Sequence, residues 1–212
     1  MRRTISIALA LFAVLLGTAI FVIFIIDAAR SAGAGAIVSL SIYGSIVVLL
    51  HVIHLITLVR VRHIPFAPLI QKFNSVFVFL LIAGSYTPIY LAILPTSWGV
   101  SLLSVTWAFA IIGIALKLSP QPLNQKLAAL TFIIVDWSIV IAFVPLHRLL
   151  PPLGLRLLTL GSLLYAFSII LERRYVQETI TSLKANIPQI FLILGNTSHF
   201  LLIYLYILHL KL

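Results

Sequence analysis

The sequence predicts an all-α integral membrane protein, a bundle of seven transmembrane helices. Three observations lead to this fold class. The 212 residues are 62% hydrophobic and only 8% charged, seven long apolar segments follow one another, and most cations lie between those segments. Because a soluble domain carries about 25% charged residues, this composition could not cover a soluble surface. We expect a single membrane domain, residues 1–212, with no separate soluble domain.

The first apolar segment is an uncharged run of 23 residues from Thr4 to Ile26, preceded by Arg2 and Arg3. At 1.5 Å per residue, such a run crosses ~30 Å of hydrocarbon. A cleaved signal peptide is the alternative, with the small residues 32–34 as its cleavage site. The run is longer than the apolar core of a signal peptide, and charged residues separate it from that site, so we expect a retained helix.

The other six segments are separated by turns that contain basic residues, proline or glycine, which interrupt helices. One of these turns contains Trp98, a residue type that favours the membrane interface. The expected helices cover about residues 4–26, 33–59, 74–94, 100–116, 127–146, 153–171 and 187–210.

The cations predict how the chain crosses the membrane. Ten of the 14 lysines and arginines lie at the end of the helices that holds the N-terminus, and four lie at the other end. Cytoplasmic loops are enriched in Lys and Arg, so we expect the N-terminus in the cytoplasm and the C-terminus outside. The cytoplasmic cations would attract anionic lipid headgroups of the surrounding bilayer. A soluble basic face for nucleic acid is lacking, and the oligomeric state is not predicted.

A family resemblance appears in the third expected helix. Its segment Leu81-Ile82-Ala83-Gly84-Ser85-Tyr86-Thr87-Pro88 resembles the third transmembrane helix of the hemolysin III family, bacterial relatives of the adiponectin and progestin receptors. Weaker similarities follow the family order at 43–45, 107–117, 160–165 and 195–200. The resemblance implies a multi-pass protein of a bacterial cytoplasmic (inner) membrane, and the family name implies a pore-forming or membrane-damaging activity.

The resemblance also implies where a zinc ion would bind. The family holds zinc with one histidine of the second helix and two of the seventh, and a third-helix aspartate holds the metal-bound water. Counted from the matching motifs, these positions are occupied here by Thr57 (or Leu58), Asn74, Ala185 and Gln189. Ala cannot bind metal, the Gln oxygen is a poor zinc ligand, and Asn cannot act as a base. We therefore expect no zinc cofactor and no zinc-dependent hydrolysis.

Four ionisable residues remain at mid-membrane depth, where such side chains are costly and normally face the interior of a bundle. With three polar neighbours they form the candidate cluster: His51, His54, Asn74, Ser85, Tyr86, Asp136 and His199. Three interpretations stay open. The cluster is a structural hydrogen-bond network, a path for ions or protons, or a metal site whose ligands have moved to the three histidines and Asp136.

The sequence therefore favours a non-enzymatic hemolysin III-like protein that conducts ions, forms pores or senses lipid. One alternative is a metal-dependent lipid amide hydrolase, similar to a ceramidase, with relocated ligands. Another is a proton-coupled transporter, although the sequence contains no evident inverted repeat. The absence of cysteine excludes disulfide and thiolate chemistry.

Overall fold

The computed structural model describes residues 2–31, 34–60, 67–174, 184 and 186–209. Within these ranges the chain forms seven α-helices, followed by one turn of π-helix, and contains no strand. The elements are α1 (Arg2–Ser31), α2 (Ala34–Arg60), α3 (Ala67–Ala92), α4 (Thr96–Leu118), α5 (Pro122–Leu149), α6 (Pro152–Arg174), α7 (Asn186–Ile203) and η1 (Tyr204–His209).

Each expected helix overlaps one observed helix, but several ends differ. The largest difference concerns α3, which begins at Ala67 rather than near residue 74. Pro68 is compatible with this earlier start, because the first turn of a helix does not need its backbone N–H. The first helix also continues beyond Ile26 to Ser31, so that Arg30 lies in the last turn, where a cation suits the helix dipole.

The helices are those of a multi-pass membrane protein. Six are long and apolar enough to cross a bilayer, while the described apolar part of α3, Val76–Ala92, is shorter. Large apolar side chains point outward along the helices, including Leu15 (69% exposed) and Val144 (63% exposed). An apolar surface of this extent is suited to hydrocarbon rather than to water.

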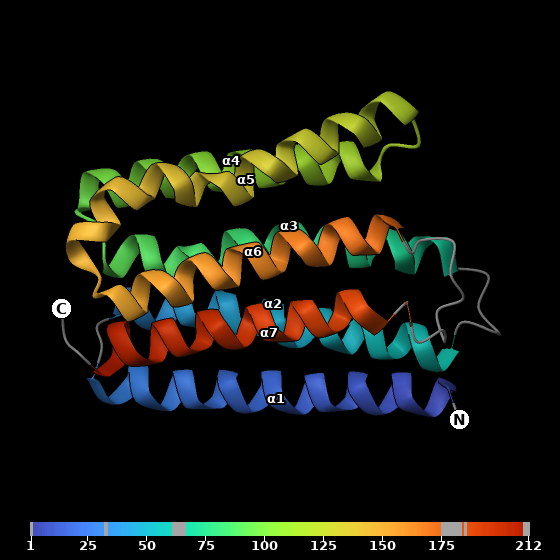
Figure 1. Ribbon diagram of the computed structural model, residues 1–212, viewed down its shortest axis with the longest axis horizontal. Coiled ribbons are helices and arrows are strands. Elements are labelled where there is room, and N and C mark those ends of the chain that lie inside the picture. Colours follow the sequence, from blue (N-terminus) through green and yellow to red (C-terminus); the bar gives the residue numbers. More distant parts are fainter. Residues whose placement is uncertain (1, 32–33, 61–66, 175–183, 185, 210–212) are drawn as a thin grey trace.

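The helices are arranged in successive layers (Figure 1). In that view α1 lies at one edge, followed by α2 with α7, then α3 with α6, and finally α4 with α5. Helices that follow one another from α1 to α5 pack against each other, and α6 packs against α7. The first helix begins at one end of the bundle and α7 ends at the other (Figure 1).

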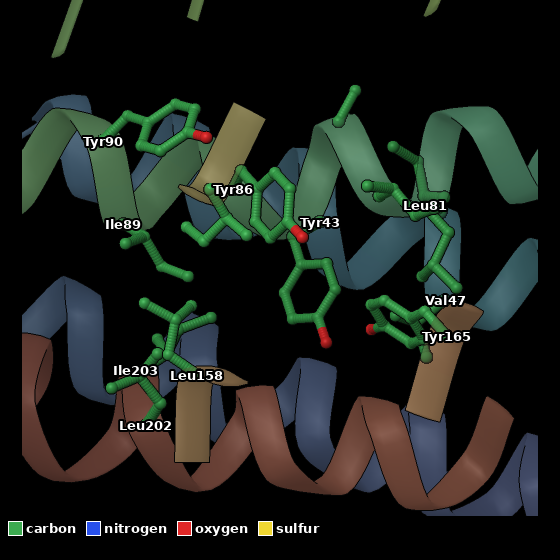
Figure 2. Packing of buried hydrophobic residues seen from close by; sticks show 14 of the residues in the cluster. Tyr43, Val47, Leu81, Tyr86, Ile89, Tyr90, Leu158, Tyr165, Leu202 and Ile203 are labelled. Carbon is green, nitrogen blue, oxygen red and sulfur yellow. The ribbon is translucent and has the colours of Figure 1, made fainter. Parts of the chain in front are cut away.

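Tyrosine side chains occupy the centre of the bundle. Tyr43, Tyr86, Tyr90 and Tyr165 are fully buried. They lie among the aliphatic side chains of the core (Figure 2). Because a buried hydroxyl needs a hydrogen-bond partner, these tyrosines determine where the other polar groups of the interior must lie.

Glycines allow α6 and α7 to approach closely. A Cβ atom added to Gly161 would lie 2.3 Å from Cδ2 of His199, and one added to Gly195 would lie 2.7 Å from the Tyr165 ring. Small residues at a helix contact are typical of membrane proteins, where close backbone packing holds helices together.

We expect Gly161→Ala to destabilise the protein by about 1–3 kcal/mol, because the added methyl group overpacks the contact with His199. Gly35→Ala is the matched control, since a Cβ there would meet nothing within 4 Å. Thermal unfolding in detergent would compare both variants with the parent protein. Equal melting temperatures for the two variants would contradict this account of the α6–α7 contact.

Candidate functional site

The side chain of Asn196 on α7 connects three helices. Its Oδ1 accepts a hydrogen bond of 2.7 Å from the Tyr165 hydroxyl of α6. Its Nδ2 lies 3.2 Å from Nε2 of His51 on α2. The Asn196 backbone carbonyl also accepts a long bond of 3.5 Å from the Tyr43 hydroxyl of α2. These four residues are buried, so the bonds form away from solvent.

His51 has an amide of α7 beside each ring nitrogen. Its Nδ1 lies 3.0 Å from the side-chain amide of Gln189, and its Nε2 faces Asn196. Because Oδ1 of Asn196 is bonded to Tyr165, the Asn196 NH₂ group must be the donor to Nε2. A neutral His51 then carries its proton on Nδ1, and this N–H needs an acceptor. Rotating the Gln189 amide by half a turn, so that Oε1 and Nε2 exchange places, provides that acceptor.

A second polar group surrounds Tyr86 of α3. Its hydroxyl lies 3.3 Å from both Oδ1 and the backbone carbonyl of Asp136 on α5. It also lies 3.0 Å from Oγ of Ser162 on α6, which donates to the Leu158 carbonyl at 3.0 Å. The orientation of α5 is clear from two neighbours, because Asp136 is 6% exposed and Trp137 is 62% exposed. The carboxyl group therefore faces the bundle while the indole faces outward.

His199 of α7 lies between the two groups. Its ring centroid is 4.9 Å from that of Tyr165, in an edge-on arrangement, and 5.9 Å from that of Tyr86. The side chain is completely buried, and neither ring nitrogen forms a hydrogen bond to the described residues. The Leu158 carbonyl, which accepts the Ser162 hydroxyl at 3.0 Å, also approaches the His199 ring, and its second lone pair faces the imidazole.

A third group of hydroxyls extends the polar interior toward α4. The Tyr90 hydroxyl of α3 lies 2.9 Å from Oγ of Ser138 on α5, and Thr106 of α4 donates to the same oxygen at 3.1 Å. Ser138 in turn donates to the Val135 carbonyl at 2.7 Å. Every hydroxyl of this group has a hydrogen-bond partner, as buried hydroxyls require.

The structure thus divides the candidate cluster inferred from the sequence. His51 lies in the Asn196 group, Tyr86 and Asp136 form the second group, and His199 separates the two. Ser85 is buried, donates to the Ile82 carbonyl and interacts with Tyr165.

The remaining predicted positions contribute less. His54 is only half-buried and forms no hydrogen bond with the described residues of either group, but it lies close enough to His51 to interact with it electrostatically. Thr57 bonds the Ile53 carbonyl of its own helix. Asn74 lies on α3, but its side chain is outside the described part of the chain, as is Ala185.

Sequence reasoning missed Asn196, Tyr165, Ser162 and Tyr43. The sequence did contain one signal for this group of residues. Asn196 is an amide in the middle of an apolar span, three residues before His199. In lipid such a side chain has to find a partner on another helix, which marks it as a contact residue.

The donor set around His51 does not suit zinc. Both imidazole nitrogens face amide groups, and Gln189 offers an amide where the family resemblance places a histidine. Among the described residues, no three His, Cys, Asp or Glu side chains are grouped so that they could hold a metal ion. The arrangement therefore gives no support to a site relocated to His51, His54, Asp136 and His199.

Comparison with known proteins identifies the family. Residues 3–177 match the family model described as Haemolysin-III related, a stretch that includes α1 to α6 and stops before α7. Hemolysin-3 of Bacillus cereus is 34% identical over 149 residues, which are 68% of this chain and 66% of that protein, slightly under two thirds of its length. The Hemolysin-3 homolog of Bacillus subtilis (strain 168) is 32% identical over 157 residues, 72% of this chain and 71% of that protein. No solved structure matches the chain. The family match and both relatives agree with the resemblance of the third helix, and the chain belongs to the haemolysin-III related family.

Proposed function

We propose that this protein conducts small cations across the membrane without zinc and is not a hydrolase. The observation that carries the zinc-free part is the environment of His51. Its two ring nitrogens are bonded to Gln189 and Asn196, so the imidazole stabilises the contact between α2 and α7 instead of binding a metal. A zinc hydrolase needs histidine nitrogens that are available to the ion.

The polar interior supports conduction. Buried polar groups from five helices lie near the middle of those helices, where His51, Asn196 and Tyr165 are joined by hydrogen bonds and Tyr86 is joined to Asp136. Ionisable side chains inside a membrane protein commonly mark the route of an ion or a proton. The relatives are named hemolysins, a name for proteins that permeabilise cells, and conduction is the form of permeation that these buried groups favour.

We further propose that all seven helices span a bacterial cytoplasmic membrane, with the N-terminus inside and the C-terminus outside. The distribution of ten cations at one end and four at the other supports this orientation. The third helix has 26 residues and is about 39 Å long, enough to cross although its apolar part is short. Anionic headgroups would bind at the cytoplasmic loops.

Cysteine labelling tests this orientation, because the chain has no cysteine of its own. In intact cells, we expect a membrane-impermeant maleimide to label Ser97→Cys, in the first turn of α4 on the outer side. The Gln121→Cys variant, in the turn between α4 and α5, should react only after the cells are permeabilised. The opposite pattern would overturn the orientation, and labelling of both sites in intact cells would show that α4 does not span.

Elemental mass spectrometry and a flux assay test the function. We expect the purified protein to contain no stoichiometric zinc, and liposomes that contain it to pass monovalent cations faster than protein-free liposomes. A strong zinc chelator should leave the flux unchanged, because no ligand set depends on the metal. Stoichiometric zinc together with chelator-sensitive cleavage of a lipid amide would contradict the proposal and favour the hydrolase.

A further inference from the structure

We propose that Asp136 and His199, linked by Tyr86 and Ser162, form a proton-binding site in the middle of the bundle. The inference rests on the proposed function insofar as it names the proton as the cation that is conducted. The binding site itself is argued from the geometry alone.

The carboxyl group of Asp136 lies deep in the bundle. The residue is 6% exposed and is 14 residues from the start of α5 and 13 from its end, about 20 Å from either. Among the described residues, its carboxyl group bonds to the Tyr86 hydroxyl rather than to a Lys or Arg. Since an unpaired carboxylate is strongly disfavoured at this depth, Asp136 gains stability by taking up a proton.

His199 provides an independent observation. Its imidazole is completely enclosed, and neither nitrogen is hydrogen-bonded to the described residues. A neutral imidazole has one nitrogen with a free lone pair, which can accept a proton. The rings of Tyr165 and Tyr86, with centroids 4.9 and 5.9 Å away, are close enough to stabilise the resulting cation.

Tyr86 brings the two groups together. Its hydroxyl is 3.3 Å from the Asp136 carboxyl oxygen, and its ring neighbours the His199 ring. Ser162 lies 3.0 Å from the same hydroxyl and directly follows Gly161, against which the His199 ring packs. The carboxyl and the imidazole therefore flank one side chain, and their protonation is expected to be coupled.

The chemistry of the site favours a proton over a metal cation. Hard metal ions prefer about six or more oxygen ligands. The side chains here offer the Asp136, Tyr86 and Ser162 oxygens, which already bond to one another and to the Leu158 carbonyl. A proton needs only one lone pair. Its uptake converts the Asp136 carboxylate into a neutral acid and its release reverses this, with no other reactant.

Among the described groups that face the site, Asp136 and His199 are the two that we expect to take up and release protons. Tyr90 of α3, Tyr165 of α6 and Tyr43 of α2 are phenols, which stay neutral over the ordinary pH range. Hydrogen bonds lead from His51 of α2 to Asn196 and from Asn196 to Tyr165, and these two side chains separate His51 from His199. No Lys or Arg among the described residues bonds to the site.

Infrared difference spectroscopy and proton flux test the inference on the full-length protein. Between acid and alkaline pH, we expect the parent protein to show a protonated-carboxyl band that Asp136→Asn removes. His199→Asn should shift the pH at which this band titrates. In liposomes under an imposed potential, both variants should lower proton flux at least tenfold. Asp27→Asn and His147→Asn, at helix ends, are the matched controls and should change neither readout.

Tyr86→Phe is a second test variant, for the case that Asp136→Asn does not fold. It removes the Tyr86 hydroxyl and keeps the Asp136 carboxyl group. We expect its carboxyl band to move in frequency, since one hydrogen bond is lost, whereas an unmoved band would contradict the Tyr86–Asp136 contact. Survival of this same band in Asp136→Asn, at the frequency and titration pH that it has in the parent protein, would overturn the site. Loss of the band in that variant, with no flux in the parent, would support the site and refute conduction. If the parent protein passes sodium or potassium but no protons, and Asp136→Asn leaves that flux unchanged, the proposed cation conduction would stand and this inference would be overturned.

Discussion

The hydrogen bonds of Asn196 determine how the polar part of the bundle is built. One amide satisfies Tyr165 of α6 through its oxygen and His51 of α2 through its nitrogen, while its backbone carbonyl accepts from Tyr43. In a hydrocarbon environment an unpaired amide or hydroxyl is costly, so each bond fixes the position of a helix. Gly161 and Gly195 are needed for the same bonds, because the absence of a side chain lets α6 and α7 lie close enough for them to form.

This arrangement holds α2 and α7 of a haemolysin-III related chain together by hydrogen bonds, which suits the zinc-free function proposed above. His51 of α2 joins α7 through two amides, Gln189 and Asn196. Asp136 and His199 are buried polar groups outside this contact. They are the groups on which the proposed conduction of protons depends.

Much of the fold was predictable because lipid imposes simple requirements. Long apolar runs separated by basic turns predicted an all-α membrane protein, and the cost of a buried carboxylate placed Asp136 inside, where it lies. Two differences between the expected and the observed positions have physical causes. The start of α3 mixes polar and apolar residues, so no apolar run marked it. His54 follows His51 by three residues, about 60° short of a full turn, which leaves it half-buried while His51 is enclosed. The partners of Asn196 depend on how distant helices pack, which no local pattern contains.

A double-mutant cycle with Tyr165→Phe and Asn196→Leu measures the central interaction most directly. The free energy of unfolding of the parent, the two single variants and the double variant would be compared in detergent. The account predicts a coupling of about 1 kcal/mol or more, because each single change leaves the other partner buried without its hydrogen bond. Additive effects would contradict it, since they would mean that Asn196 and Tyr165 do not hold α6 and α7 together.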